Sequence, residues 1–232
     1  MTEPVGTGTA RSARPSPRVA ARQADARRRI LQAARVVVAE QGFAAAQIAV
    51  VADMADVATG TIYRHFPSKA SLFSEMLRAV CVRELEVVRA ITGEPGRRAT
   101  DRLGDAVATF VDRALRGEGL AYAVIVEPMD PEVDQVRLDA RAELAAAFAD
   151  LITEGVEAGE FPEQDAGVRG AAIVGAFLEG VVAPLAGRTA HAPDRDAVST
   201  EIARFAQTGV AGTPPGTRPD IRAVPSPTGA EP

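Results

Sequence analysis

The chain has 232 residues, of which 47% are hydrophobic and 25% are charged, so it can bury the core of one domain or of two closely packed ones. Its formal net charge of −5, averaged over the whole chain, argues against nucleic-acid binding. One cysteine, Cys81, excludes an intrachain disulfide and a metal site built from several cysteines, and His65 and His191 lie too far apart in sequence to suggest a histidine-based metal centre.

The charge is unevenly distributed along the chain. Residues 1–85 hold 12 basic and 7 acidic side chains, a net charge of +5, whereas residues 86–232 hold 14 and 24, a net charge of −10. A basic segment joined to an acidic body fits a nucleic-acid-binding module attached to a second domain, although a solvated basic face would give the same numbers.

Both ends of the chain are predicted to be disordered. Residues 1–23 form a basic arm with several prolines and arginines, and residues 212–232 form a tail with too many prolines for a helix. The arm either adds phosphate or minor-groove contacts to DNA or is a mobile terminus.

Between these ends, apolar residues recur at spacings of three and four, which predicts an all-α fold. The first helix is expected at 24–41, ended by Gly42, a residue typical of helix C-termini. Two short helices, 47–54 and 58–66, precede a long helix for which Ser68 is the predicted N-cap. The remaining helices are expected at residues 98–116, 120–126, 131–158, 165–186 and 193–208.

Residues 47–69, QIAVVADMADVATGTIYRHFPSK, contain the most informative pattern in the chain. Two short helices joined by a tight turn form a helix-turn-helix, whose second helix enters the major groove of DNA. The turn falls at residues 55–57, where Asp56 tolerates a left-handed backbone. In the second helix, Ile62 and Phe66 lie four residues apart and are expected to face inward.

The polar residues of this motif remain for its outer face. Candidates for contact with phosphates or base edges are Thr59, Gly60, Thr61, Tyr63, Arg64 and His65, together with Lys69 in the first turn of the next helix. Tyr63 also fits half-buried packing, and His65 also fits a cap or core position.

The string GTIYRHF from Gly60 to Phe66, followed by Ser68, Lys69 and Leu72, resembles the signature of the TetR family of bacterial transcriptional regulators. The Gly42-Phe43 pair and the Val51-Ala52-x-x-Ala55 segment are also similar to it. The resemblance implies a DNA-binding domain over residues 24–84 and a helical domain for effector binding and dimerisation over residues 85–211. The expected function is a ligand-responsive repressor that binds a palindromic DNA operator as a dimer.

The sequence departs from the family pattern in three places. Ala46 and Gln47 stand where the first motif helix usually opens with Thr or Ser, Asp56 stands where the turn usually has Gly, and Ala58 stands where Ser usually caps the second helix. A missing cap costs about 0.5–2 kcal/mol of helix stability. Gln47 can still reach a phosphate, so it joins the DNA-binding candidates.

The resemblance also implies an effector pocket between the helices from about residue 72 to residue 152. Candidates for its lining are Phe110, Tyr122, Glu127 and Met129, each of which also fits an ordinary core or turn position. The helix at 165–186, rich in Gly and Ala, is expected to pair with 193–208 and with the same two helices of a second subunit. A buried central helix of a monomer is the alternative.

The predicted partners are therefore double-stranded DNA, a small-molecule effector and a second copy of the chain, with no cofactor and no membrane. The sequence holds no Ser/His/Asp arrangement, no HExxH and no glycine-rich phosphate loop, so we expect no enzyme; a helical adaptor that uses the motif for protein contacts is the alternative. The best candidate for a membrane span, residues 170–187, is interrupted by Glu179 and Pro184, and no secretory signal is evident, so we expect a cytoplasmic protein.

Overall fold

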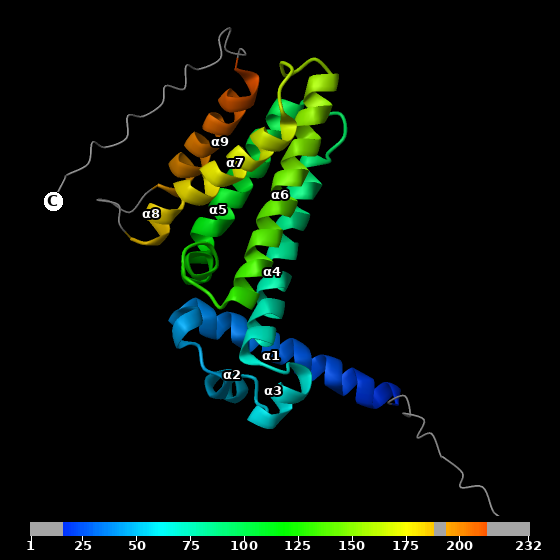
Figure 1. The fold of residues 1–232 in the computed structure, drawn as a ribbon, viewed down its shortest axis with the longest axis vertical. Coiled ribbons are helices and arrows are strands. Elements are labelled where there is room, and N and C mark those ends of the chain that lie inside the picture. Colours follow the sequence, from blue (N-terminus) through cyan, green and yellow to red (C-terminus); the bar gives the residue numbers. More distant parts are fainter. Residues whose placement is uncertain (1–15, 188–193, 213–232) are drawn as a thin grey trace, which may run out of the picture.

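The computed structural model describes residues 16–187 and 194–212, and all regular secondary structure in these ranges is helical (Figure 1), which confirms the all-α prediction. The helices are α1 (Pro17–Ala45), α2 (Ile48–Met54), α3 (Thr59–His65), α4 (Lys69–Thr92), α5 (Ala99–Ile125), α6 (Pro131–Glu157), α7 (Ala166–Gly180), α8 (Val182–Leu185) and α9 (Arg195–Ala211). Helices α1 to α3 form one end of an elongated molecule, and α4 runs from there beside α6 (Figure 1).

Helix α1 begins earlier than the sequence pattern indicated. Pro17 occupies the first helical turn, and the Ser16 hydroxyl accepts a hydrogen bond from the Val19 N–H at 3.4 Å. The prediction of disorder is therefore wrong for residues 17–23, because a proline in the first turn has no intrahelical bond to lose and fits a helix start. The rest of the predicted arm, residues 1–15, and the tail from residue 213 lie outside the described residues.

Helix α5 joins two segments that the sequence pattern separated, 98–116 and 120–126. The backbone bends at Glu118, which has φ 39° and ψ −112°. Beside the bend, a Cβ at Gly119 would lie 2.1 Å from the carbonyl oxygen of Ala39 in α1. The glycine therefore allows α5 to touch the backbone of α1, a contact between distant segments that no local pattern reveals.

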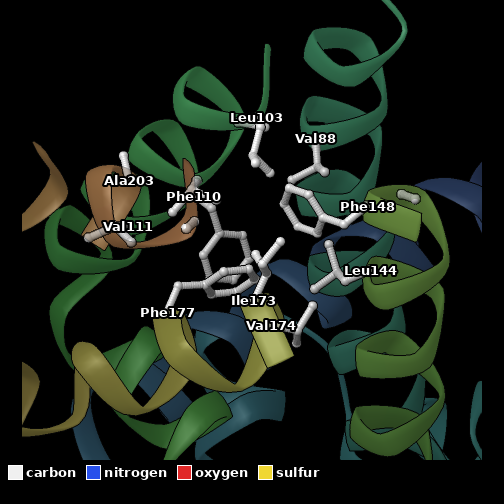
Figure 2. Packing of buried hydrophobic residues seen from close by; sticks show 14 of the residues in the cluster. Val88, Leu103, Phe110, Val111, Leu144, Phe148, Ile173, Val174, Phe177 and Ala203 are labelled. Carbon is white, nitrogen blue, oxygen red and sulfur yellow. The ribbon is translucent and has the colours of Figure 1, made fainter. Parts of the chain in front are cut away.

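Two clusters of buried apolar residues hold the helices together. The C-terminal cluster lies among α4, α5, α6, α7 and α9, and the rings of Phe110 and Phe148 pack on Phe177 at centroid distances of 4.5 and 5.9 Å (Figure 2). The N-terminal cluster lies among α1, α2, α3 and the first half of α4. It also takes in four residues from the end of α5 and the start of α6: Leu120, Ala123, Val133 and Val136.

Helices α7 and α8 form an unusually apolar segment. Residues 166–185 are long and apolar enough to cross a membrane by length and composition, despite the interruptions at Glu179 and Pro184. Only a third of that apolar window is buried. α7 packs on α6, where a Cβ at Gly170 would lie 2.4 Å from the Ala145 carbonyl oxygen. The segment therefore has one face packed on the protein and another face that is apolar and uncovered.

The contact at Gly119 predicts a difference between two neighbouring glycines. Gly119→Ala should lower the free energy of unfolding by about 1–3 kcal/mol, because the new methyl group overlaps the backbone of α1. Gly117→Ala is the control, since its Cβ would have only an ordinary contact at 3.5 Å. Urea titrations compare the two, and equal stability of both variants would contradict the close approach of α5 and α1.

Candidate DNA-binding and effector sites

The turn of the helix-turn-helix is held by an arginine of α1. Asp56 has φ 52°, the left-handed conformation that the sequence predicted, and the Val57 N–H donates to the Ala52 carbonyl at 3.0 Å. The Arg29 guanidinium donates to the carbonyl oxygen of Ala55 at 2.8 Å. Arg29 thus satisfies a carbonyl at the end of α2, where a helix leaves such groups without an internal partner.

Helix α3 is anchored along its inner side. Ile62 and Phe66 are fully buried in the N-terminal cluster, as predicted. The Arg27 guanidinium lies 5.0 Å from the centroid of the Phe66 ring and forms an ion pair with Glu75 of α4. Because Ile62 and Phe66 are held in the N-terminal cluster and Arg27 of α1 contacts Phe66, the inward residues also determine which side of α3 faces outward.

The helix starts around the motif differ in how they are capped. Ser68 caps α4, and its hydroxyl accepts a hydrogen bond from the Ser71 N–H at 2.9 Å, which confirms that prediction. Gln47 and Ala58 are the N-cap residues of α2 and α3, and neither makes a side-chain cap hydrogen bond. The two short helices therefore depend on packing and on Arg29 rather than on caps.

The eight predicted DNA-binding residues belong to α3, to the start of α2 and to the start of α4, at the end of the molecule away from α9 (Figure 1). We call them the motif surface: Gln47, Thr59, Gly60, Thr61, Tyr63, Arg64, His65 and Lys69. All are exposed except Thr61 and His65, which are half-buried.

Individual side chains on this surface differ in their freedom. Tyr63 is 50% exposed, so about half of its surface is open to solvent and the other half is covered by the protein. The Arg64 guanidinium donates to the Thr61 hydroxyl at 3.2 Å, and space around Gly60 is open. His65 lies against Phe66, with ring centroids 6.3 Å apart, so it combines partial packing with partial exposure.

The candidate effector residues do not form one site. Phe110 lies in the C-terminal cluster, whereas Met129 packs against the N-terminal cluster. Tyr122 is half-buried on α5. A cavity of about 410 Å³ does lie between α6 and α7, with Arg141 and Glu179 among mostly apolar lining residues, but none of the four candidates lines it.

The fourth candidate, Glu127, connects the two parts of the molecule. Its carboxylate accepts a hydrogen bond from the Phe43 N–H at 2.9 Å, and its carbonyl oxygen accepts one from Arg137 at 3.0 Å. Gly42 has φ 74°, and a Cβ there would lie 2.4 Å from the carboxylate. The turn after α5 is therefore fastened to the end of α1.

The described residues contain no group of three or more His, Cys, Asp or Glu side chains suited to a metal ion. Burial raises the pKa of the Cys81 thiol to about 11, with Glu84 and Glu143 adding to the shift, so Cys81 is protonated at neutral pH and unreactive. The anchoring roles of Arg27 and Arg29 were missed by sequence analysis, since nothing in an arginine-rich stretch indicates which members touch the motif.

Residues 30–76 match the family model described as "Bacterial regulatory proteins, tetR family". The chain is 35% identical over 133 residues to the HTH-type transcriptional repressor KstR of Rhodococcus jostii, a match that covers 52% of this chain and 60% of that protein. It is 29% identical over 110 residues to the HTH-type transcriptional regulator UidR of Escherichia coli, covering 46% of this chain and 54% of UidR. These matches therefore span less than two thirds of either relative.

Among solved structures, the chain is similar to the transcriptional regulator FadR from Bacillus subtilis in complex with stearoyl-CoA. The TM-score is 0.69 at 22% sequence identity, and the match covers 79% of this chain and 98% of that one. At this identity the likeness establishes the fold.

The hydrogen bonds of Arg29 predict a difference between two adjacent arginines. Arg29→Ala should lower the free energy of unfolding by about 1 kcal/mol, because it leaves the Ala55 carbonyl unpaired at a strained turn. Arg28→Ala is the control, since within the described residues Arg28 pairs only with exposed Asp25. Thermal unfolding followed by circular dichroism measures both, and an Arg29 variant as stable as the Arg28 variant would contradict the assigned role.

Proposed function

We propose that this chain, a member of the tetR family of bacterial regulatory proteins through its residues 30–76, is a ligand-responsive transcriptional repressor that binds a palindromic DNA operator as a dimer. The observation that carries the proposal is the motif surface. Hydrogen-bond donors are exposed on a short helix whose other side is fixed in the N-terminal cluster. That is what a recognition helix needs in order to enter a major groove at a defined angle.

The motif surface supports a division of roles among its residues. Tyr63 and Arg64 project from α3 and suit base edges, while open space at Gly60 lets the helix approach the DNA closely. Gln47 and Lys69 lie at the starts of α2 and α4 and suit phosphates on either side of the groove. The net charge of +5 on residues 1–85 supports DNA as the partner, despite the acidic remainder of the chain.

The uncovered face of α7 supports a dimer. Val168 is 64% exposed and Ala172 is exposed beside it, while the exposed Ala171 and Gly175 also line the cavity between α6 and α7, which therefore adjoins this face. Phe205 on neighbouring α9 is 66% exposed. Small residues allow helices to approach closely, so α7 and α9 of two copies would form a four-helix interface, in which the apolar face is covered by protein rather than by a membrane. Two copies of α3 would then read two half-sites of an operator in the cytoplasm.

The effector is proposed to act on the C-terminal helices. The cavity between α6 and α7 is large enough for a small molecule, its lining is mostly apolar, and Arg141 could pair with an acidic group. Stearoyl-CoA, the compound held by the structurally similar FadR, is the first ligand to test. By linkage, an effector that weakens the operator complex must bind the DNA-free conformation better by the same factor.

The connection at Glu127 gives such an effector a route to the motif. The end of α5 and the start of α6 belong to the N-terminal cluster, and the Glu127 carboxylate holds the end of α1. A shift of α6 would therefore move α1, and with it the attached α3.

The proposed DNA binding predicts specific losses. Tyr63→Ala and Lys69→Ala should each weaken binding to DNA from upstream of the chain's own gene by about tenfold, the size of a lost base or phosphate contact. A gel shift at several salt concentrations measures binding, and sedimentation tests whether wild type and variants are dimers. If no promoter fragment gives a salt-sensitive shift with the wild-type chain, the adaptor interpretation replaces the regulator.

The Glu127 connection predicts a local change. Glu127→Ala should make the Phe43 amide exchange with solvent at least tenfold faster, because an N–H bonded to a carboxylate is released. It should also weaken operator binding, since α1 is less firmly placed. Glu132→Ala, at an exposed position in the first turn of α6, is the control. An unchanged exchange rate of the Phe43 amide would show that this hydrogen bond does not hold the end of α1 in place.

A further inference from the structure

The first two turns of α1 stand free of the rest of the protein. Residues 16–25 are exposed on every side, and the first buried residue of α1 is Ile30. In Figure 1 this end of the helix, in dark blue, projects past α3 and α4. It also precedes residues 30–76, the part of the chain that matches the family. A free helical extension buries nothing, so the core does not account for it.

The direction in which Arg18 and Arg22 point can be inferred from that of Arg29. Arg18, Arg22 and Arg29 lie at positions i, i+4 and i+11, which at about 100° per residue places them within about 20° of one line along the helix. The Arg29 guanidinium reaches the turn of the helix-turn-helix, at the Ala55 carbonyl. Arg18 and Arg22 therefore lie on the side of α1 that faces the helix-turn-helix, but closer to the N-terminus than the part of α1 that contacts it.

The charge of this stripe is not neutralised within the described residues. Neither Arg18 nor Arg22 has an ion-pair or hydrogen-bond partner there, and the first turn of α1 holds no acidic residue. Asp25, the acidic residue on the same side, is already engaged with Arg28 at 2.6 Å and with Arg29 at 3.5 Å. Two unpaired guanidinium groups thus remain on a helical extension that faces the motif side.

We propose that Arg18 and Arg22 form a second DNA-binding surface, which grips the phosphate backbone outside the groove that α3 enters. Arg27 contacts the end of α3 at Phe66, and the two arginines lie about 8 and 14 Å farther along the α1 axis. The extension therefore leads outward from the end of α3 that Arg27 contacts, toward the flanking duplex. This inference rests on the proposed function and gives the extension a sequence-independent role in affinity.

The test is the salt dependence of binding to a labelled duplex from upstream of the chain's own gene, measured by fluorescence anisotropy with the full chain. Each phosphate contact contributes about 0.9 to the slope of log K against log salt, so Arg18→Ala with Arg22→Ala should reduce that slope by about 1.8 per chain. At 0.1 M salt the affinity should fall on the order of tenfold to a hundredfold, equally for this duplex and for a random one.

Two further variants separate a phosphate contact from a general effect of charge. Arg18→Lys with Arg22→Lys should keep most of the slope, since a phosphate accepts a point charge. Arg78→Ala with Arg83→Ala removes the same charge from exposed positions of α4 and should leave the slope unchanged. Alanine favours helix, so circular dichroism should show α1 intact.

A wild-type slope in the Arg18 and Arg22 double alanine variant would overturn the inference. An equal loss in the Arg78 and Arg83 control would also overturn it, because net charge would then explain the effect. Failure of the wild-type chain to bind any such duplex would instead overturn the proposed function itself.

Discussion

Burial of one side of α3 is the constraint on which the rest of this structure depends. A seven-residue helix without a side-chain cap has little stability of its own, so its position must come from its neighbours. Ile62 and Phe66 supply apolar burial, and Arg27 and Arg29 of α1 hold the end of α3 and the turn before it. The polar side of α3 is consequently presented in one orientation, which is what recognition of a DNA groove requires.

The same constraint links the two parts of the chain. The N-terminal cluster is completed by residues from α5 and α6, so helices α1 to α3 do not form an independent core. Two close contacts reinforce the link: α5 meets α1 at Gly119, and the turn after α5 meets α1 at Gly42. Packed interfaces of this kind change between discrete arrangements rather than deforming continuously, which suits a protein whose proposed effector and DNA sites are far apart.

Much of this could be predicted from the sequence because the relevant signals are local. The periodicity placed the helices, Ser68 was recognised as a cap, and Asp56 was recognised as a left-handed turn residue. What could not be predicted depends on tertiary contacts. The way α5 meets α1 accounts for the bend at Glu118 and for the hydrogen bond from α1 to Glu127. The start of α1 was ambiguous for a different reason, since a proline such as Pro17 can either precede a helix or occupy its first turn. Two of the effector-pocket candidates, Phe110 and Met129, belong to different clusters.

The left-handed turn at Asp56 has a consequence for how this sequence can vary. An aspartate in the left-handed conformation has a higher free energy than a glycine, because it has a Cβ atom. Arg29, from another helix, donates a hydrogen bond to the adjoining carbonyl of Ala55. The two positions are therefore energetically coupled rather than independent. In an evolving lineage, the order of substitutions matters: glycine at the turn relaxes the demand on the arginine, whereas losing the arginine first leaves a strained turn unsupported. Aspartate in place of glycine at position 56 thus restricts which residues can replace Arg29.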